Sequence, residues 1–360
     1  MKVGLIVYGD LDLVSGGNLY DRMLVEHLER RGHEVALVSL AHGGEFRHLA
    51  QNFKPGLERK LASSGFDVLL QDELTHRSLF LLNERLRRRI SYPIVSIVHH
   101  LRSSEDHPER QLERYRRVEK RYLESVDAFV FNSHATRESV EFLLQKKTRN
   151  VVATPGGNRL EAGLSRDDVE RRAREAGPLR LLFVGNVIPR KRLHVLLTVL
   201  GELRDAPWKL EIVGSAEMDR DYALAIERQI QSLALDAKVS MHGTLGGELL
   251  AERYRAAQVL VVPSSYEGFG IVYLEAMGFG LPVIAGAAGA SDEIVEHDSI
   301  GFLVPPDDTF SLRLQLERLI EDRELVRQMS VHAFERFADH STWEQSMTSI
   351  EAMLTALVER

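Results

Sequence analysis

Short apolar runs alternate with amphipathic stretches along almost the whole chain, and the runs fall into two blocks. In the first half they occupy residues 2–9, 34–40, 67–71, 93–100, 128–133 and 150–155. In the second half they occupy residues 180–186, 209–215, 238–243, 259–264, 282–287 and 301–306. Continuous apolar runs of this length are typical of parallel strands buried on both faces. The alternation therefore predicts an α/β protein with two doubly wound domains.

The domain boundary is predicted where the first block ends. The turn "TPGGN" at 154–158 stops the last run of that block, and a charged stretch at 167–176 precedes "GPLRLLFVG". We expect a Rossmann-like domain at 1–165 and a second one at 178–339, facing each other across a cleft. Ligands of open α/β sheets bind beyond the carboxyl ends of the strands, so residues just after each strand are the candidates for function.

Composition narrows the class of protein only slightly. The 360 residues are 44% apolar and 28% charged, and none is cysteine, which excludes disulfides and thiolate metal sites. No run approaches the roughly 20 apolar residues of a membrane span, and the first 20 residues lack a signal-peptide core. We therefore expect a cytoplasmic protein. The net charge of −7 divides into +3 for residues 1–175 and −10 for 176–360, which favours domains with different partners and indicates no nucleic-acid binding.

The loop after the first strand lacks the Gly-x-Gly-x-x-Gly fingerprint of a dinucleotide site, which argues against a nicotinamide dehydrogenase. It carries Ser15-Gly16-Gly17-Asn18 instead. Two glycines at a helix start can present N–H groups to an anion, although a plain N-cap explains them equally well. Asp10-x-Asp12 only superficially matches a metal-binding pair. We expect no metal at this loop, because cationic side chains elsewhere would serve a diphosphate.

Two other strand ends carry histidines or cations that could bind a ligand. The fourth strand ends in His99-His100, where a histidine can hydrogen-bond a ligand hydroxyl or act as a structural residue. Arg190, Lys191 and Arg192 lie where a strand has ended and a helix begins. Cations oppose the helix dipole there, so the cluster indicates either a bound anion such as a diphosphate or a solvated basic corner.

Two glutamates stand eight residues apart in "PSSYEGFGIVYLEAMGFGLPVIA", residues 263–285. Glu267 lies just beyond a buried strand, and Gly268-Phe269-Gly270 then turns into the helix that carries Glu275. The turn's amides favour phosphate oxygens, and a carboxylate accepts bonds from paired hydroxyls. A sugar, a diphosphate and a ribose in line make a nucleotide-sugar. Such glutamate pairs are common, so the whole string carries this interpretation.

The string resembles the donor-site signature of the retaining GT-B glycosyltransferases of family 4. The likeness continues through "HGTLGGELLAERYRAAQVLVVPS" before it and "AGASDEIVEHDSIGFLVPPDD" after it, and it covers nearly all of residues 179–325. It implies two Rossmann-like domains, with the second binding the donor. It also implies that helices at about 340–360 return to complete the first domain.

The resemblance assigns the candidate residues as follows. It implies that Glu275 binds ribose hydroxyls and that Glu267 binds hydroxyls of the donor sugar. It places the backbone of Gly268, Phe269 and Gly270 on sugar and phosphate. It further implies phosphate binding by Lys191, a diphosphate-closing loop at Gly16 and Gly17, and a position near the donor sugar for His99, with His100 the second choice.

The chain departs from the family pattern at the first strand of the second domain. Gly185-Asn186 stands where these proteins usually carry Gly-Arg, and Arg192 follows the lysine where glycine is usual. Arg190 is therefore the candidate to supply the missing guanidinium charge. The implied reaction transfers a sugar from a UDP- or GDP-sugar to an acceptor hydroxyl with retention, and without a metal. A non-hydrolysing nucleotide-sugar epimerase and a non-catalytic nucleotide-sugar-binding protein are the alternatives.

Residues 77–121 hold 12 Lys+Arg against 6 Asp+Glu, gathered in two amphipathic helical segments. Basic amphipathic helices can lie on anionic lipid, and many members of the family use lipid-linked acceptors. The other interpretation is that both helices pack into the core and expose arginine-rich faces. The first predicts peripheral association with the inner face of a membrane, and the second does not.

Overall fold

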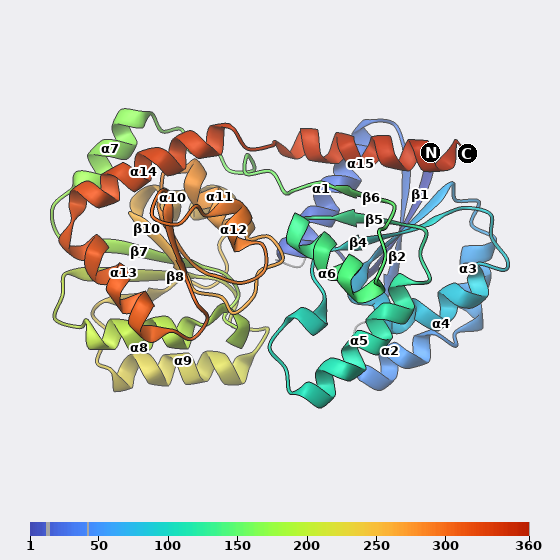
Figure 1. Cartoon of the computed structure of the whole chain (residues 1–360), viewed down its shortest axis with the longest axis horizontal. Coiled ribbons are helices and arrows are strands. Elements are labelled where there is room, and N and C mark those ends of the chain that lie inside the picture. Colours follow the sequence, from blue (N-terminus) through green and yellow to red (C-terminus); the bar gives the residue numbers. More distant parts are fainter. Residues whose placement is uncertain (12–14, 42, 360) are drawn as a thin grey trace. The chain divides into compact units, whose positions relative to one another are not determined.

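The computed structural model describes residues 1–11, 15–41 and 43–359, and the chain divides into two compact units. Unit 1 comprises Met1–Pro155 together with the C-terminal segment from Trp343, and unit 2 comprises Gly156–Thr342. In Figure 1, unit 1 carries the blue to green segments and the red helix α15, while unit 2 carries the remaining segments. Each unit holds one parallel sheet of six strands.

The sheet of unit 1 has the strand order β2-β1-β3-β4-β5-β6, with every pair parallel. Its middle strands are buried along their whole length, as continuous apolar runs predict. The strands are β1 (Lys2–Tyr8), β2 (Glu34–Leu40), β3 (Val68–Asp72), β4 (Ile94–Val98), β5 (Ala128–Phe131) and β6 (Asn150–Val152). The helices are α1 (Gly16–Arg30), α2 (Glu45–Gln51), α3 (Pro55–Ala62), α4 (His76–Leu86), α5 (Glu109–Leu123), α6 (His134–Leu144) and α15 (Trp343–Val358), with the short 3-10 turns η1 (Glu73–Thr75) and η2 (Arg102–Ser104).

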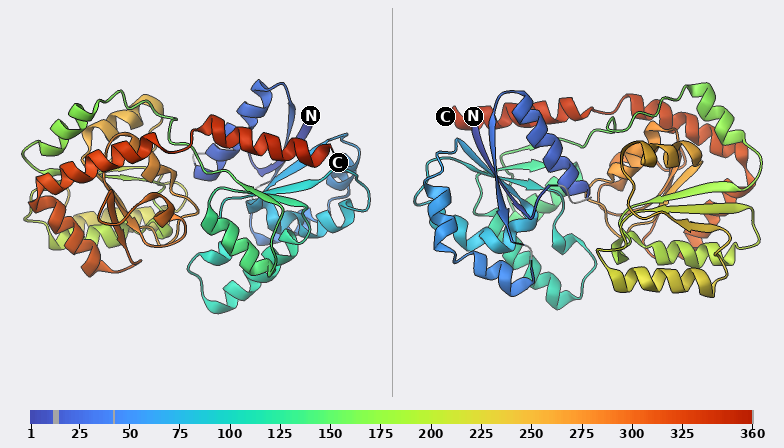
Figure 2. Two further views of the ribbon diagram at one scale, coloured as in Figure 1. Left: turned by 45° about the horizontal axis from the view of Figure 1, so that its top comes forward. Right: turned by 180° about the vertical axis from the view of Figure 1, so that it is seen from behind.

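The sheet of unit 2 repeats this design with the order β12-β11-β10-β7-β8-β9. Figure 2 shows helices on both faces of each sheet. The strands are β7 (Leu179–Val184), β8 (Trp208–Val213), β9 (Val239–Met241), β10 (Val259–Val262), β11 (Val283–Gly286) and β12 (Gly301–Val304). The helices are α7 (Arg166–Arg174), α8 (Leu193–Glu202), α9 (Arg220–Ser232), α10 (Gly247–Ala256), α11 (Ile271–Gly278), α12 (Ser291–Ile294), α13 (Thr309–Glu321) and α14 (Arg323–Ala338), with the 3-10 turn η3 (Pro189–Lys191). Two doubly wound α/β units are thus confirmed.

The strand order reverses once in each unit, and the reversal fixes where ligands can bind. In unit 1 the chain leaves β1 toward β2 and then returns to the other side with β3. In unit 2 it leaves β7 toward β8 and returns with β10. The crossovers on either side of such a point lie on opposite faces, so a crevice opens beyond the carboxyl ends of the two central strands.

The structure corrects the expected end of the first domain. Unit 1 ends at Pro155 rather than at 165, and the charged stretch taken as the approach to unit 2 is helix α7, a part of unit 2. Ser165 and Asp168 form a reciprocal capping box at its start, and Val169 and Ala173 are buried against unit 2. The sequence pattern missed this helix because only two apolar residues mark its buried face.

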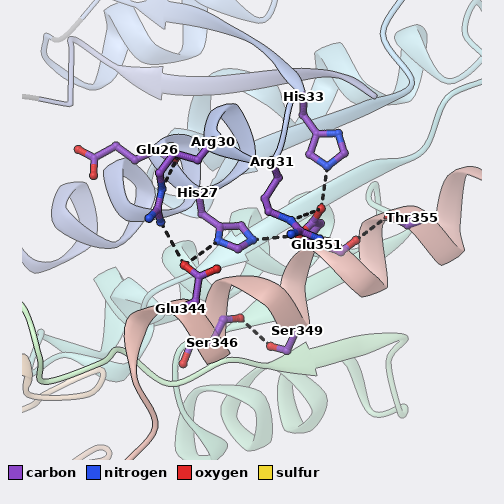
Figure 3. Close-up of polar contacts among 10 residues, drawn as sticks. All are labelled: Glu26, His27, Arg30, Arg31, His33, Glu344, Ser346, Ser349, Glu351 and Thr355. Carbon is purple, nitrogen blue, oxygen red and sulfur yellow. Dashed lines mark hydrogen bonds and ion pairs between the residues drawn. The ribbon is translucent and has the colours of Figure 1, made fainter.

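Helix α15 belongs to unit 1 and is held to α1 by a cluster of polar contacts around the buried His27 (Figure 3). Its carboxylates face His27, whose Nε2 lies 3.0 Å from Glu351 Oε2 and whose Nδ1 lies 3.4 Å from Glu344 Oε2. The other Glu351 oxygen lies 2.9 Å from Nε2 of His33. Trp343 also packs edge-on against Tyr20 of α1. These contacts explain why the last helix completes unit 1.

The basic helices α4 and α5 bury their apolar residues in the core of unit 1, as the core-packing interpretation predicts. Leu79, Leu82 and Leu86 of α4 are fully buried, and Tyr115 and Leu123 of α5 are nearly so. Many of the exposed arginines pair with carboxylates of unit 1, among them Arg87 with Asp127 and Arg121 with Glu84. No helix in the described part of the chain is long and apolar enough to cross a membrane.

Candidate active site

The reversal point of unit 2 brings together three of the predicted residues. Strands β7 and β10 are neighbours, with Leu181 paired to Val259. The turn η3 follows β7 and carries Arg190 and Lys191, while Glu267 follows β10. The amide of Ser265 donates to the carbonyl of Arg190 at 2.9 Å, which fastens the two loops to each other. Residues 76 positions apart in the sequence therefore meet beyond the carboxyl ends of two central strands.

Glu267 forms ion pairs with both cations of this site. Only 6% of the residue is exposed, and Lys191 Nζ lies 2.6 Å from its Oε1 while Arg190 Nη1 lies 3.5 Å from its Oε2. Burial on its own would raise the pKa of Glu267, but the two cations outweigh burial and lower it to about 2. The carboxylate is therefore ionised at every physiological pH.

Lys191 is equally enclosed, and burial lowers its pKa although Glu267 opposes the change. A Cβ on Gly185 would lie 3.2 Å from its Cε, so the glycine leaves space for the lysine stem. Arg190 Nη1 also donates to the carbonyl of Tyr266 at 2.5 Å. Two cations face one carboxylate here.

The turn at Gly268-Phe269-Gly270 is set by its glycine at the start of α11. Gly270 has φ of +100°, and a Cβ there would lie 2.4 Å from the Tyr273 ring, so only glycine fits. As the N-cap of α11, Gly270 supplies no side chain to the first amides of the helix. Phe269 is buried in the core of unit 2, so any ligand contact of this residue would come from its backbone.

Glu275 has partners that the sequence reasoning did not find. It is 2% exposed, and its Oε1 accepts from Nε and Nη2 of Arg159 at 2.9 and 2.5 Å. Its Oε2 accepts from the hydroxyl of Tyr254 at 3.1 Å. Burial and this carboxylate raise the pKa of Tyr254 well above its usual range, so the phenol stays a donor. The charge of Glu275 is tolerated in an apolar helix because Arg159, one residue beyond "TPGGN", neutralises it.

Arg192 shows why the family favours glycine after the lysine. Its φ is +54°, in the left-handed region that costs a non-glycine residue energy. Its Nε lies 2.8 Å from Oδ1 of Asp307. The third cation of the basic cluster is thus held by another carboxylate of unit 2, separately from Glu267.

In unit 1, His99 lies at the end of β4, buried to 7% exposure and packed on the glycine loop. A Cβ on Gly17 would lie 3.1 Å from its ring, so glycine is what allows this packing, while Gly16 is exposed at the start of α1. His99 Nε2 lies 3.2 Å from Oδ1 of Asp21, a fully buried residue of α1 that the sequence reasoning missed. Burial would lower the pKa of His99, but Asp21 and nearby carboxylates raise it to about 9.

Two further predictions at these loops have different outcomes. His100 pairs with Glu105 at 2.8 Å and is less buried than His99. Asp12 lies outside the described residues, so the Asp10-x-Asp12 pair stays a sequence observation.

The fold and the sequence of the chain agree with known glycosyltransferases. The family model described as "Glycosyl transferases group 1" matches residues 165–336, and the model "Glycosyltransferase Family 4" matches residues 14–158. Sucrose-phosphate synthase from Thermosynechococcus elongatus superposes with a TM-score of 0.83 at 24% identity, over 99% of both chains. The Anabaena protein HepE in complex with UDP-glucose gives 0.78 at 19% identity, over 99% of this chain and 100% of its own. These likenesses define the class as the GT-B glycosyltransferases.

Sequence relatives agree over shorter spans. An uncharacterized glycosyltransferase of Methanocaldococcus jannaschii is 36% identical over 143 residues, which is 39% of this chain and 36% of its own. D-inositol 3-phosphate glycosyltransferase of Kineococcus radiotolerans is 29% identical over 261 residues, 67% of this chain and 60% of its own. The aligned regions thus cover less than two thirds of either relative. The chain belongs to the family 4 glycosyltransferases.

We expect the substitution Asp21→Asn to discharge His99. Because the folded-state pKa of about 9 exceeds the usual 6.5, the charged His99–Asp21 pair adds stability below pH 6.5 that is lost as pH rises toward 9. Without the Asp21 charge and hydrogen bond, only Asp72 and Glu73 still oppose burial, so the pKa of His99 falls. NMR titration of the His99 ring should give a midpoint near 9 in the native chain and a lower one in the variant.

The exposed change Glu138→Gln on α6 of the same unit is the matched control for this titration and should leave the midpoint unchanged. Equal midpoints in the native chain and Asp21→Asn would show that the buried pair does not set the charge of His99.

Proposed function

We propose that the chain is a retaining glycosyltransferase that moves a hexosyl group from a UDP- or GDP-sugar to an acceptor hydroxyl. The observation that carries this proposal is the buried Glu267 held by Lys191 and Arg190 beyond β10, where the strand order of unit 2 reverses. A site at such a point is where open α/β sheets bind nucleotides. The UDP-glucose complex of HepE, a protein of the same fold, supports UDP as the first nucleotide to test.

The charges suit a sugar diphosphate. The positive charges of Lys191 and Arg190 would face the phosphates, with the arginine able to make paired bonds and the lysine acting as a compact charge. The uncapped amides at the start of α11 favour phosphate oxygens as well. Glu267, always ionised, would accept bonds from sugar hydroxyls. Because protein cations supply the charge, we propose transfer without a metal ion.

The protonation states of Glu267 and His99 favour a front-face mechanism. Glu267, with a pKa of about 2, carries no proton to donate to a leaving group, and His99, with a pKa of about 9, is already protonated near neutral pH. The acceptor proton would therefore pass to the departing diphosphate oxygen as the glycosidic bond breaks and the new bond forms on the same face. Lys191 and Arg190 would stabilise the charge that grows on that oxygen. His99 would donate a hydrogen bond to a substrate hydroxyl.

We expect Lys191→Ala to lower turnover more than it lowers affinity for the free nucleoside. Its charge acts on the diphosphate, where negative charge increases during transfer. Transfer or donor hydrolysis is followed with UDP- and GDP-sugars beside calorimetry with uridine and guanosine. Arg313→Ala, on α13 of the same unit, is a control that removes an exposed cation outside the proposed site.

Equal losses of turnover and nucleoside affinity would remove Lys191 from the leaving-group site. Binding of a nucleotide-sugar without any transfer or hydrolysis would favour a non-catalytic binding protein, and inversion of a sugar centre within the donor would favour an epimerase.

Glu275→Gln tests whether this carboxylate binds the donor ribose or only holds Arg159. A lost bond between a charged acceptor and the ribose should weaken UDP binding by about 1.5–3 kcal/mol, or about 10- to 150-fold. Arg159→Ala removes the other partner of the same ion pair. It should weaken UDP binding less than Glu275→Gln does. If both variants lower the melting temperature while folded protein binds UDP as tightly as before, Glu275 is structural.

The acceptor is proposed only as a hydroxyl compound, with a lipid-linked one as the form to test. Since the apolar residues of α4 and α5 are buried, any membrane association would act through charge, for example through the exposed Arg110 and Arg117. Attraction of about 1 kcal/mol per cation predicts salt-sensitive flotation with anionic vesicles, which Arg110→Glu and Arg117→Glu should reduce. Absence of binding at low salt would point to an acceptor free in solution.

A further inference from the structure

A second polar cluster, made of Glu73, His76 and Glu119, is buried in unit 1 apart from the residues assigned above. Glu73 begins the turn η1 after β3, His76 begins α4, and Glu119 projects from α5, a helix packed against α4. Their exposed fractions are 1%, 3% and 0%. One nitrogen or carboxylate oxygen from each lies within 4.8 Å of the others. Two carboxylates and an imidazole thus converge where water is excluded.

The imidazole of His76 has the tautomer that a metal-binding histidine usually has. Its Nδ1 lies 2.9 Å from the backbone carbonyl of Glu73, an acceptor, so Nδ1 carries the proton and donates. That tautomer leaves a lone pair on Nε2, which is buried and has no hydrogen-bond partner. Histidine ligands of metals almost always donate their other ring N–H to a carbonyl or carboxylate in this way.

The carboxylates also have coordination capacity that the protein leaves unused. Glu119 Oε1 accepts from the amide of Ser103 at 3.2 Å, but its Oε2 has no hydrogen-bond partner. Neither oxygen of Glu73 has one, although Oε1 lies 3.2 Å from the His76 nitrogen already engaged by the carbonyl. Unpaired buried oxygens are costly, and two neighbouring carboxylates repel each other.

Nearby arginines do not neutralise this cluster directly. Arg77 Nη1 lies 2.9 Å from Glu45 Oε1, and its guanidinium lies over the ring of Tyr115. Arg102 stacks on the same ring. Within the described part of the chain, neither arginine forms an ion pair with Glu73 or Glu119. The unpaired oxygens and nitrogen of these three side chains therefore lack a positive charge between them.

We propose that Glu73, His76 and Glu119 bind a divalent first-row transition ion, with zinc(II) as the best match. One imidazole and two carboxylates are ligands that zinc accepts with an open fourth position. The Glu-x-x-His spacing, joined by a glutamate from another helix, is also the arrangement that carboxylate metal sites in helical proteins use. The ion would join the start of α4 to α5 and so stabilise unit 1. This role is separate from the proposed sugar transfer.

The other buried trio, Asp21, Asp72 and His99, lies as close together but is more fully bonded, and among its described atoms only Asp21 Oδ2 is buried without a hydrogen-bond partner. His99 and Asp21 bond each other, and Asp72 Oδ1 accepts from the amide of Leu74. The argument for an ion therefore applies to one cluster and not to its neighbour.

The test uses the purified full chain, and its first readouts need no variant. Elemental analysis should find about one equivalent of zinc after expression in zinc-supplemented medium. A chelator should lower the melting temperature, and added zinc chloride should restore it. Cobalt(II) exchanged into the chelated protein should give the visible absorption of a low-coordinate nitrogen–oxygen site.

His76→Gln and Glu119→Gln should each abolish the bound equivalent and the response to zinc. Glu141→Gln is the matched control, since Glu141 is a buried carboxylate of unit 1 whose oxygens are already bonded to Lys147 and Thr148. It should keep the metal.

Three results would overturn the proposal. One is a native chain that binds neither zinc nor cobalt and whose melting temperature does not change when either metal is added. Another is unchanged metal content in His76→Gln. The third is unchanged metal content in Glu119→Gln, which would place any bound ion elsewhere in the chain.

Discussion

The ion pair between Glu267 and Lys191 is the interaction on which the candidate site depends. A buried carboxylate is strongly disfavoured unless it is paired, and removing one partner of such a pair leaves an uncompensated charge. Here the pair joins the loop after β7 to the loop after β10, with Arg190 adding a second positive charge. The parallel pairing of those strands brings the two loops together. The order of the strands thus determines which charges meet in the site.

Buried charges in the two units are handled in different ways. In unit 2, Glu267 and Glu275 each have an internal cationic partner. In unit 1, His99 is held charged by Asp21, whereas Glu73, His76 and Glu119 keep unused donors. Burial raises the pKa of Glu73 to about 7, as expected for a carboxylate whose charge is not compensated. The contrast separates buried charges that have an internal partner of opposite charge from a buried cluster that has none.

Much of the fold could be predicted from the sequence because strand signals are local. Each apolar run became a strand, and loop residues such as Lys191 and Glu267 follow their strands as expected. Pairings were harder to foresee. Arg159 meets Glu275 and Asp21 meets His99 only through the fold, across 116 and 78 positions of sequence. Helix α7 was missed because its buried face is narrow. The faces of α4 and α5 could not be assigned from amphipathicity alone, since core and lipid select the same pattern.

A crystal structure of the full chain with bound UDP would test the central claim most directly. The account predicts the diphosphate within hydrogen-bond distance of Lys191 Nζ, Arg190 and the amides of Gly268–Gly270. Glu267 should stay ionised beside them, and the ribose hydroxyls should lie on Glu275. A nucleotide bound elsewhere in unit 2, with the Glu267–Lys191 pair unchanged and remote from every phosphate, would contradict it.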